Sequence, residues 1–149
     1  MDREDIHPEA AVAPGYLANH AARVFNRNVD NALREHGLSL SLLGPLLLLS
    51  WRGPMLQRDL VQASAVKQPA MVALLGKLEM MGLIARSPAP DDRRAALVSL
   101  TGAGARMAQI GGEALRAENK HALANLSAAE GEMLISLLQR LITGLEQGT

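Results

Sequence analysis

The stretch Asp91-Asp92-Arg93-Arg94-Ala95-Ala96-Leu97-Val98-Ser99-Leu100-Thr101 decides the fold. It starts as a polar loop with two adjacent arginines and continues over 95–100 as an alternating pattern, which is typical of a half-buried strand. It ends on Thr101, a residue type that caps helices. A second short strand is predicted over 83–87, and the polar connection over 88–94 contains two prolines. The two strands therefore form a hairpin that projects a basic loop, which is the form of a wing.

Helical patterns surround this hairpin. Apolar spacing and capping residues predict helices over about 15–36, 39–51, 57–63, 68–81 and 102–125. Ser127-Ala128-Ala129-Glu130 is a capping box that starts a last helix. A short helix, a tight turn, a second helix and a hairpin form a winged helix-turn-helix. The predicted fold class is therefore mainly α, with a two-stranded β wing between long N- and C-terminal helices.

The composition sets the kind of core and excludes some classes of protein. The 149 residues suffice for one domain, and 48% of them are hydrophobic. With one Trp, one Tyr and one Phe, the interior must be filled by aliphatic side chains, which favours helices. The chain has no cysteine, so disulfides and thiol redox sensing are excluded.

The zero net charge hides an uneven distribution. From residue 52 to residue 106 the chain carries eight basic and four acidic side chains, whereas the remainder is acidic by the same margin. A basic middle suggests that this segment meets a polyanion. Chance clustering of charges on solvated faces is the alternative.

Other functional classes lack support in the sequence. The charged start has no apolar core of a secretory signal, and no apolar run is long enough to span a bilayer, so we expect a cytoplasmic location and no membrane partner. No Gly-rich phosphate loop and no spaced nucleophile set is present, so we expect neither an enzyme nor a cofactor. The four histidines are scattered, and no metal site is expected.

The sequence resembles the MarR family of bacterial transcriptional regulators. The resemblance runs ungapped from about residue 37 to 104, and the same order of elements extends over nearly the whole chain. The matching pieces are Gly37-Leu38-Ser39, Gly53-Pro54, Asp59-Leu60-Val61, the run Leu78-Glu79-Met80-Met81-Gly82-Leu83-Ile84, and the wing from Asp92 to Thr101.

The resemblance implies a domain organisation and a homodimer. Residues 1–14 would be a flexible arm, and 15–149 a single domain. Within it, 38–101 would form the winged helix-turn-helix, while 15–37 and 102–149 would form the dimerisation helices. Two-fold dimers place recognition helices about one duplex turn apart, roughly 34 Å, which suits a palindromic operator in double-stranded DNA.

The resemblance also implies the DNA contacts. Arg94 would enter the minor groove with Asp92 holding its guanidinium, while Arg93 would face phosphate or solvent. A solvated Asp–Arg pair on a surface turn is the alternative. The helix over 68–81 would enter the major groove, although its outer face has Pro69, Ala70, Val72 and Ala73 where the family usually has Ser, Thr and Arg. Its polar residues are Lys67 and Lys77, which would contact phosphates, and Gln68, which either pairs with adenine or is an ordinary helix-start residue.

Family members often bind small aromatic or phenolic anions that weaken DNA binding. By position, the candidate residues for such an effector site are His20, Arg23, Trp51 and Arg52. The alternatives are a core position for Trp51 and an ordinary surface or core position for His20.

The sequence therefore predicts a sequence-specific DNA-binding regulator, a repressor that a small ligand releases from its promoter. The outer face of the helix over 68–81 has few polar side chains. This motivates a second hypothesis, a winged-helix protein-interaction module with weak DNA binding of its own.

Overall fold

The computed structural model describes residues 7–148. Residues 1–6 of the predicted arm lie outside the described residues. Within the rest of that arm, Ala10–Val12 form a short 3-10 helix, and the first long helix begins at Pro14. The chain divides after Leu115 into two compact units.

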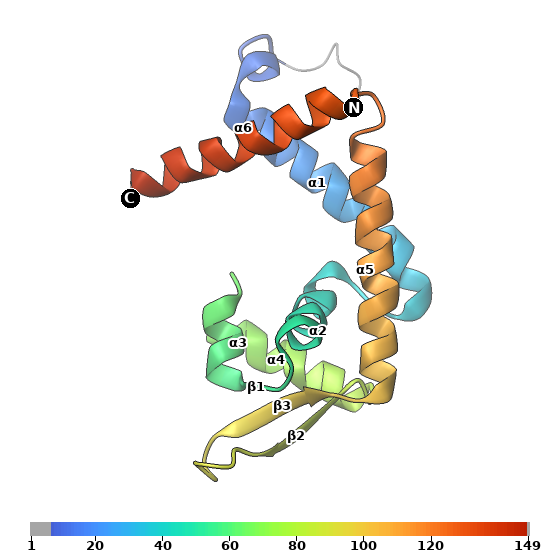
Figure 1. The fold of residues 1–149 in the computed structure, drawn as a ribbon, viewed down its shortest axis with the longest axis vertical. Helices are drawn as coiled ribbons and strands as arrows, with labels where there is room; N and C mark the ends of the chain where they lie inside the picture. The colour runs from blue at the N-terminus through green and yellow to red at the C-terminus, as the bar shows by residue number, and fades with distance from the viewer. Residues whose placement is uncertain (1–6, 149) are drawn as a thin grey trace. The chain divides into compact units, whose positions relative to one another are not determined.

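The first unit contains the predicted winged helix-turn-helix (Figure 1). Its elements are η2 (Ala10–Val12), α1 (Pro14–Leu33), η3 (Arg34–His36), α2 (Leu40–Arg52), β1 (Met55–Leu56), α3 (Gln57–Ala63), α4 (Gln68–Met80), β2 (Ile84–Pro88), β3 (Ala96–Leu100) and the first part of α5 (Gly102–Ala122). The second unit contains the end of α5 and α6 (Ala128–Gln147).

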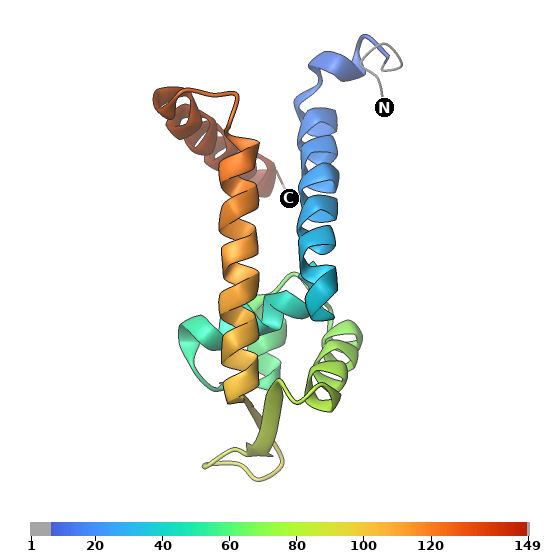
Figure 2. The ribbon, with the colours of Figure 1, turned by 90° about the vertical axis from the view of Figure 1, so that its right-hand side faces the viewer.

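Helix α1 joins the core through its C-terminal half. Val29 and Leu33 are fully buried, whereas Leu17 near the other end is 46% exposed, and Figure 2 shows α1 extending well beyond α2. The chain then turns at Gly37, whose φ of 71° lies in the left-handed region that favours glycine. The α1 side chain of Asp30 accepts a hydrogen bond of 2.7 Å from the first N–H of α2, at Leu40, and so joins the two helices.

Helix α2 is the centre of the core. Ser39 caps it by accepting a hydrogen bond from the Leu42 N–H, as predicted. Four of its leucines are buried together with Pro45. The helix continues through Pro45, although proline cannot donate one backbone hydrogen bond. The packing of the buried leucines before and after Pro45 offsets this loss.

The sheet has three strands, not the two predicted. The strand order is β1-β3-β2 and all pairs are antiparallel. Met55 and Leu56 pair with Val98 and Leu97, on the side of β3 that is not occupied by β2. The sequence did not reveal β1, because two residues after a Gly-Pro turn are too few to show a strand periodicity.

The junction between the wing and α5 is closely packed. The Thr101 hydroxyl donates to the Gly82 carbonyl oxygen (2.6 Å) and accepts from the Gly104 N–H (3.0 Å), so it caps α5 and holds the start of the hairpin. A Cβ at position 104 would overlap the carbonyl oxygen of Leu83, and a Cβ at Gly111 would overlap the side chain of Leu43. These glycines allow α5 to lie against the hairpin and α2.

The second unit begins its last helix at the predicted capping box. The Ser127 hydroxyl accepts from the Glu130 N–H, and the Glu130 carboxylate accepts from the Ser127 N–H at 2.9 Å. The backbone hydrogen bond from Ser127, followed by its hydroxyl, lowers the pKa of the Glu130 carboxyl. Helix α6 exposes a row of apolar side chains: Met133, Leu134, Ile135, Leu137, Leu138, Ile142 and Leu145.

None of the helices in residues 7–148 is both long and apolar enough to cross a membrane. Within the same residues, no three His, Cys, Asp or Glu side chains come together as metal ligands would.

We expect Gly104→Ala to lower the free energy of unfolding by about 2–3 kcal/mol, because the added methyl group meets backbone that cannot yield as a side chain would. Gly76→Ala is the matched control, since a Cβ there meets open space within a helix. It should raise stability by about 0.5–1 kcal/mol. Chemical denaturation of both variants measures the difference, and equal stabilities would contradict the described packing.

Candidate nucleic-acid interface

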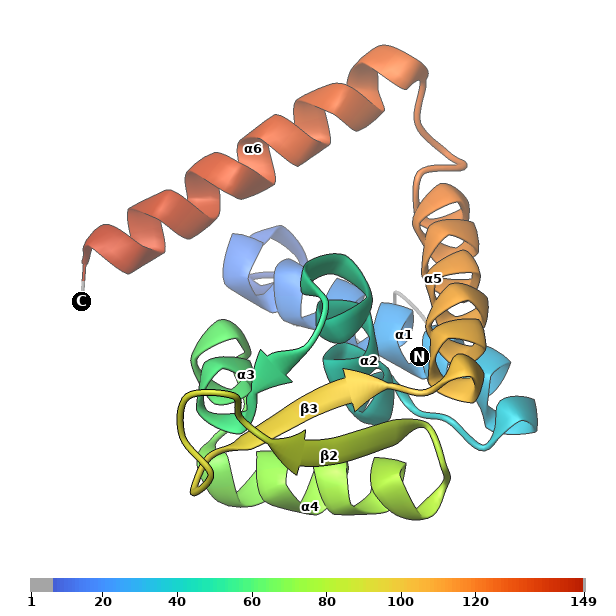
Figure 3. The same cartoon turned by 60° about the horizontal axis from the view of Figure 1, so that its bottom comes forward.

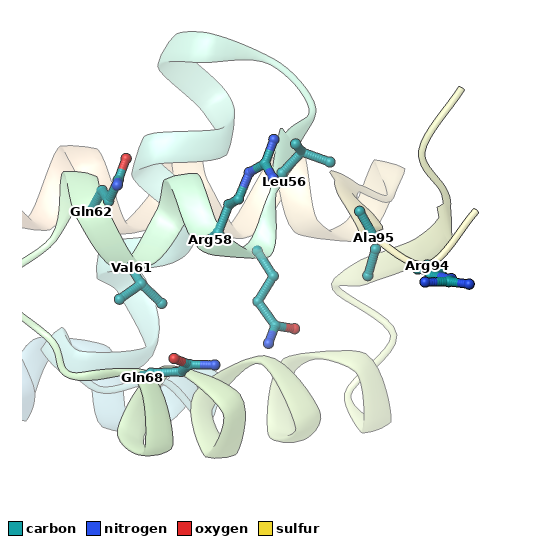
Figure 4. Close-up of a pocket in the computed structure, with 9 residues that line it drawn as sticks. Leu56, Arg58, Val61, Gln62, Gln68, Arg94 and Ala95 are labelled. Carbon is teal, nitrogen blue, oxygen red and sulfur yellow. The ribbon is translucent and has the colours of Figure 1, made fainter. Parts of the chain in front are cut away.

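A cavity of about 500 Å³ lies where α3, the start of α4 and the base of the wing meet. Figure 4 shows that its lining comes from all three elements. The lining residues are Leu56, Gln57, Arg58, Val61, Gln62, Gln68, Arg94, Ala95 and Ala96. The lining thus includes two arginines and three glutamines, and no lining residue is acidic.

The pairing of β1 with β3 places these residues together. Helix α3 begins directly after β1, so Arg58 lies two residues beyond Leu56, which pairs with Leu97. Arg94 lies two residues before β3 begins. Gln68 starts α4, and Figure 4 shows it on the far side of the cavity from Arg58. Arg58 and Gln62 were not predicted, because the sequence does not show which face of α3 turns toward the wing.

Arg86 connects the elements around this cavity. Its Nη1 donates to the Gln57 side-chain oxygen at 3.0 Å, and its Nε lies 3.3 Å from the Glu79 carboxylate. One side chain on β2 thus contacts the first residue of α3 and the last turn of α4. This network could not be predicted from the sequence, because Gln57 and Arg86 are 29 positions apart.

The wing turn differs from the prediction in one contact. Asp92 does not hold the guanidinium of Arg94; its carboxylate accepts a hydrogen bond of 3.0 Å from the Arg94 backbone N–H. The Asp92 carbonyl oxygen also accepts from the Ala95 N–H at 3.1 Å. The short aspartate side chain bonds the backbone two residues ahead, as in an Asx turn. Asp92 therefore shapes the turn and leaves the Arg94 side chain exposed.

Helix α4 lies along one side of the sheet (Figure 3). It buries Met71, Leu75 and Leu78. All ten residues predicted to contact DNA are exposed: Lys67, Gln68, Pro69, Ala70, Val72, Ala73 and Lys77 at the start and along the outside of α4, and Asp92, Arg93 and Arg94 at the wing. Gln68 and Arg94 share the cavity, whereas the contacts of the other eight with DNA stay a prediction.

None of the four residues predicted for an effector site lines this cavity. His20 is partly buried, and its ring centroid lies 6.1 Å from that of Tyr16. Its Nδ1 is shielded from solvent without a hydrogen-bond partner in the described structure. Arg23, Trp51 and Arg52 are exposed. Trp51 is 73% exposed, so a core position is wrong for the single chain, and the effector site stays a prediction.

Comparison with known proteins identifies the fold and the family. Residues 38–96, which include α2, α3, α4 and the wing turn, match the sequence model of the MarR family. A crystal structure of a probable transcriptional regulator from Pseudomonas aeruginosa is 34% identical, with a TM-score of 0.79, and the match covers 88% of this chain and 98% of that one. The chain belongs to the MarR family.

Two further matches show the range of the similarity. The transcriptional repressor NicR of Pseudomonas putida is 31% identical over 97 residues, and the match spans 65% of this chain and 61% of the length of NicR. The structure of an E. coli MarR mutant complexed with operator DNA has a TM-score of 0.80 at 22% identity and covers 91% of this chain and 99% of that one. This likeness establishes the MarR fold for the chain.

We expect Asp92→Ala to loosen the turn of this MarR wing, because the Arg94 N–H loses its acceptor. A lost exposed hydrogen bond of about 0.5–1.5 kcal/mol should speed hydrogen exchange at the Arg94 amide roughly 2- to 10-fold. Asp92→Asn is the matched control, since its side-chain oxygen still accepts. NMR exchange rates measure both, and equal rates for the alanine and asparagine variants would refute the role of the carboxylate.

Proposed function

We propose that this chain is a homodimeric transcriptional repressor that binds a palindromic operator in duplex DNA. The observation that carries the proposal is the cavity at which Arg58 from α3, Gln68 from α4 and Arg94 from the wing converge. Positive and amide side chains, with no acidic residue in the lining, suit a polyanion that also presents hydrogen-bonding edges. The repressor names of relatives such as NicR, and the operator complex of MarR, support the same function.

Each element has a role in this binding. Helix α4 enters the major groove with Gln68 at its leading end. Arg94 enters the adjacent minor groove, where the negative potential is strongest when the groove is narrow. Its guanidinium makes no ion pair within residues 7–148, so it is available to DNA. Lys67, Lys77, Arg58 and Arg93 contact phosphates, which position the protein without reading sequence.

The dimer uses the apolar row of α6. The row contains seven large apolar side chains that are each at least 38% exposed. Monomeric proteins rarely leave a contiguous apolar surface of this kind in water. A second copy of the chain covers it and places two copies of α4 on one face of the duplex.

A small aromatic or phenolic anion regulates this repressor. It binds the dimer better when the two α4 helices are spaced wrongly for DNA, and so shifts the population away from the bound form. His20 supports an effector site, since its shielded Nδ1 lacks a partner in the described structure. The protein acts in the cytoplasm and is not an enzyme. A protein-interaction module is less favoured, because it gives no reason for the positive cavity.

We expect Arg94→Ala to lower affinity for duplex DNA about 10- to 100-fold, because a minor-groove contact is lost. Arg58→Ala should weaken binding to all sequences and reduce the slope of log affinity against log salt by about one, as loss of a phosphate contact does. Fluorescence anisotropy with a duplex selected from a random pool, over a series of salt concentrations, measures both.

Arg34→Ala is the control for this experiment, since it removes an exposed arginine outside the cavity. Its affinity and salt dependence should equal those of the original protein. Unchanged affinity in Arg94→Ala would refute the wing contact. Failure of the original protein to bind any duplex at low salt would refute the function and leave the interaction-module hypothesis.

We expect Ile142→Glu to convert the dimer to monomers, because the charge would be buried within the apolar row of α6. Gln139→Glu places the same charge on the polar side of α6 and should leave the dimer intact. Sedimentation velocity at micromolar concentration distinguishes the two. A dimer that persists in Ile142→Glu would place the interface elsewhere.

A further inference from the structure

The outer face of α4, which is the face that would meet DNA, is apolar. The stripe opposite the buried one consists of Pro69, Ala73, Gly76 and Met80, at the spacing that places residues on one side of a helix. Val72 lies beside it. Met80 is 90% exposed and Val72 is 44% exposed. These apolar groups are therefore presented to solvent rather than to the core.

No contact within residues 7–148 explains this composition. A Cβ at Gly76 would meet no atom within 4 Å, and Gly76 is not among the glycines with a positive φ. A glycine within a helix costs about 0.5–1 kcal/mol relative to alanine. Its absence of a side chain leaves room for a close approach from outside the protein.

The charges around the face indicate what approaches it. Lys67 precedes the first turn of α4, and Lys77 lies at the side of the outer stripe in the last turns. Arg58 and Arg94 share the cavity beside Gln68. An apolar strip bordered by cations complements a surface that has apolar groups between two rows of negative charge. The major groove of DNA, bordered by phosphates, has this form.

The major groove presents one apolar group to a protein, the C5 methyl of thymine. We propose that α4 reads thymine methyl groups, through Val72 and Ala73 with Pro69 and Met80 beside them, and that Gln68 is its principal hydrogen-bonding reader. This inference rests on the proposed function and deepens it. It implies that each operator half-site contains A·T pairs at the positions below the middle of α4.

The stripe also accounts for a base readout without Ser, Thr or Arg. Ala and Val can contact a methyl group but cannot bond to the exocyclic groups of guanine or cytosine. Specificity then comes from the presence or absence of a methyl group at each position. Removing one buried methyl group lowers the affinity for the duplex by about three- to fourfold.

The test replaces thymine by uracil, which lacks only this methyl group. A duplex selected from a random pool is resynthesised with one dU at each dT position in turn, and its affinity is measured by anisotropy at fixed salt. We expect a three- to fourfold loss at two or more positions in each half-site. The Val72→Ala variant removes both γ-methyl groups and with them the proposed contact, so one of these thymine-to-uracil ratios should fall toward one.

Lys77→Ala is the matched control, because loss of a phosphate contact should weaken the thymine and uracil duplexes equally and preserve every ratio. Equal affinity for thymine and uracil at all positions would overturn the inference while leaving DNA binding established. Ratios that are the same in the original protein and in Val72→Ala would also overturn it for Val72, since they would reflect DNA shape. Absence of binding to any duplex would overturn the proposed function instead.

Discussion

The pairing of the two-residue strand β1 with β3 is the constraint on which the proposed DNA interface depends. Met55 and Leu56 pair with Val98 and Leu97, and this ties the start of α3 to the strand that leaves the wing. Without this pairing the hairpin would still pack on the core through Ile84 and Val98, but the start of α3 would lose its backbone link to β3. With it, Arg58 and Arg94 are held on one cavity, and Arg86 adds bonds to both α3 and α4.

The sequence predicted the elements better than their contacts. The winged helix-turn-helix and the caps at Ser39, Thr101 and Ser127 are confirmed, because apolar spacing and capping are local signals. Strand β1 was missed because it is too short to show a period. Arg58, and the bonds of Arg86 across 29 positions, were missed because the sequence does not show which polar faces turn toward each other. The Asp92 carboxylate was predicted to bind the Arg94 guanidinium, but it accepts from the Arg94 backbone N–H instead. In a short loop an Asx turn competes with an ion pair.

The structure also suggests a role for the apolar outer face of α4. From the sequence, Pro69, Ala70, Val72 and Ala73 weaken the case for base recognition. In the structure these residues lie on the exposed side of a helix whose leading residue, Gln68, borders a positive cavity. The charged groups of α3 and the wing can supply affinity, and the apolar face of α4 can then supply discrimination. This division of labour follows from phosphate contacts carrying little sequence information.

The central claim is that α4 and the wing engage one duplex together, and footprinting in both grooves tests it most directly. Hydroxyl radicals report protection of the minor groove, and methylation of guanine N7 reports protection of the major groove. The account predicts, in each half-site, a protected stretch of major groove and a protected stretch of minor groove about half a turn away, roughly 5 base pairs. In Arg94→Ala the minor-groove protection alone should disappear. Protection of a single groove in the original protein would contradict the account.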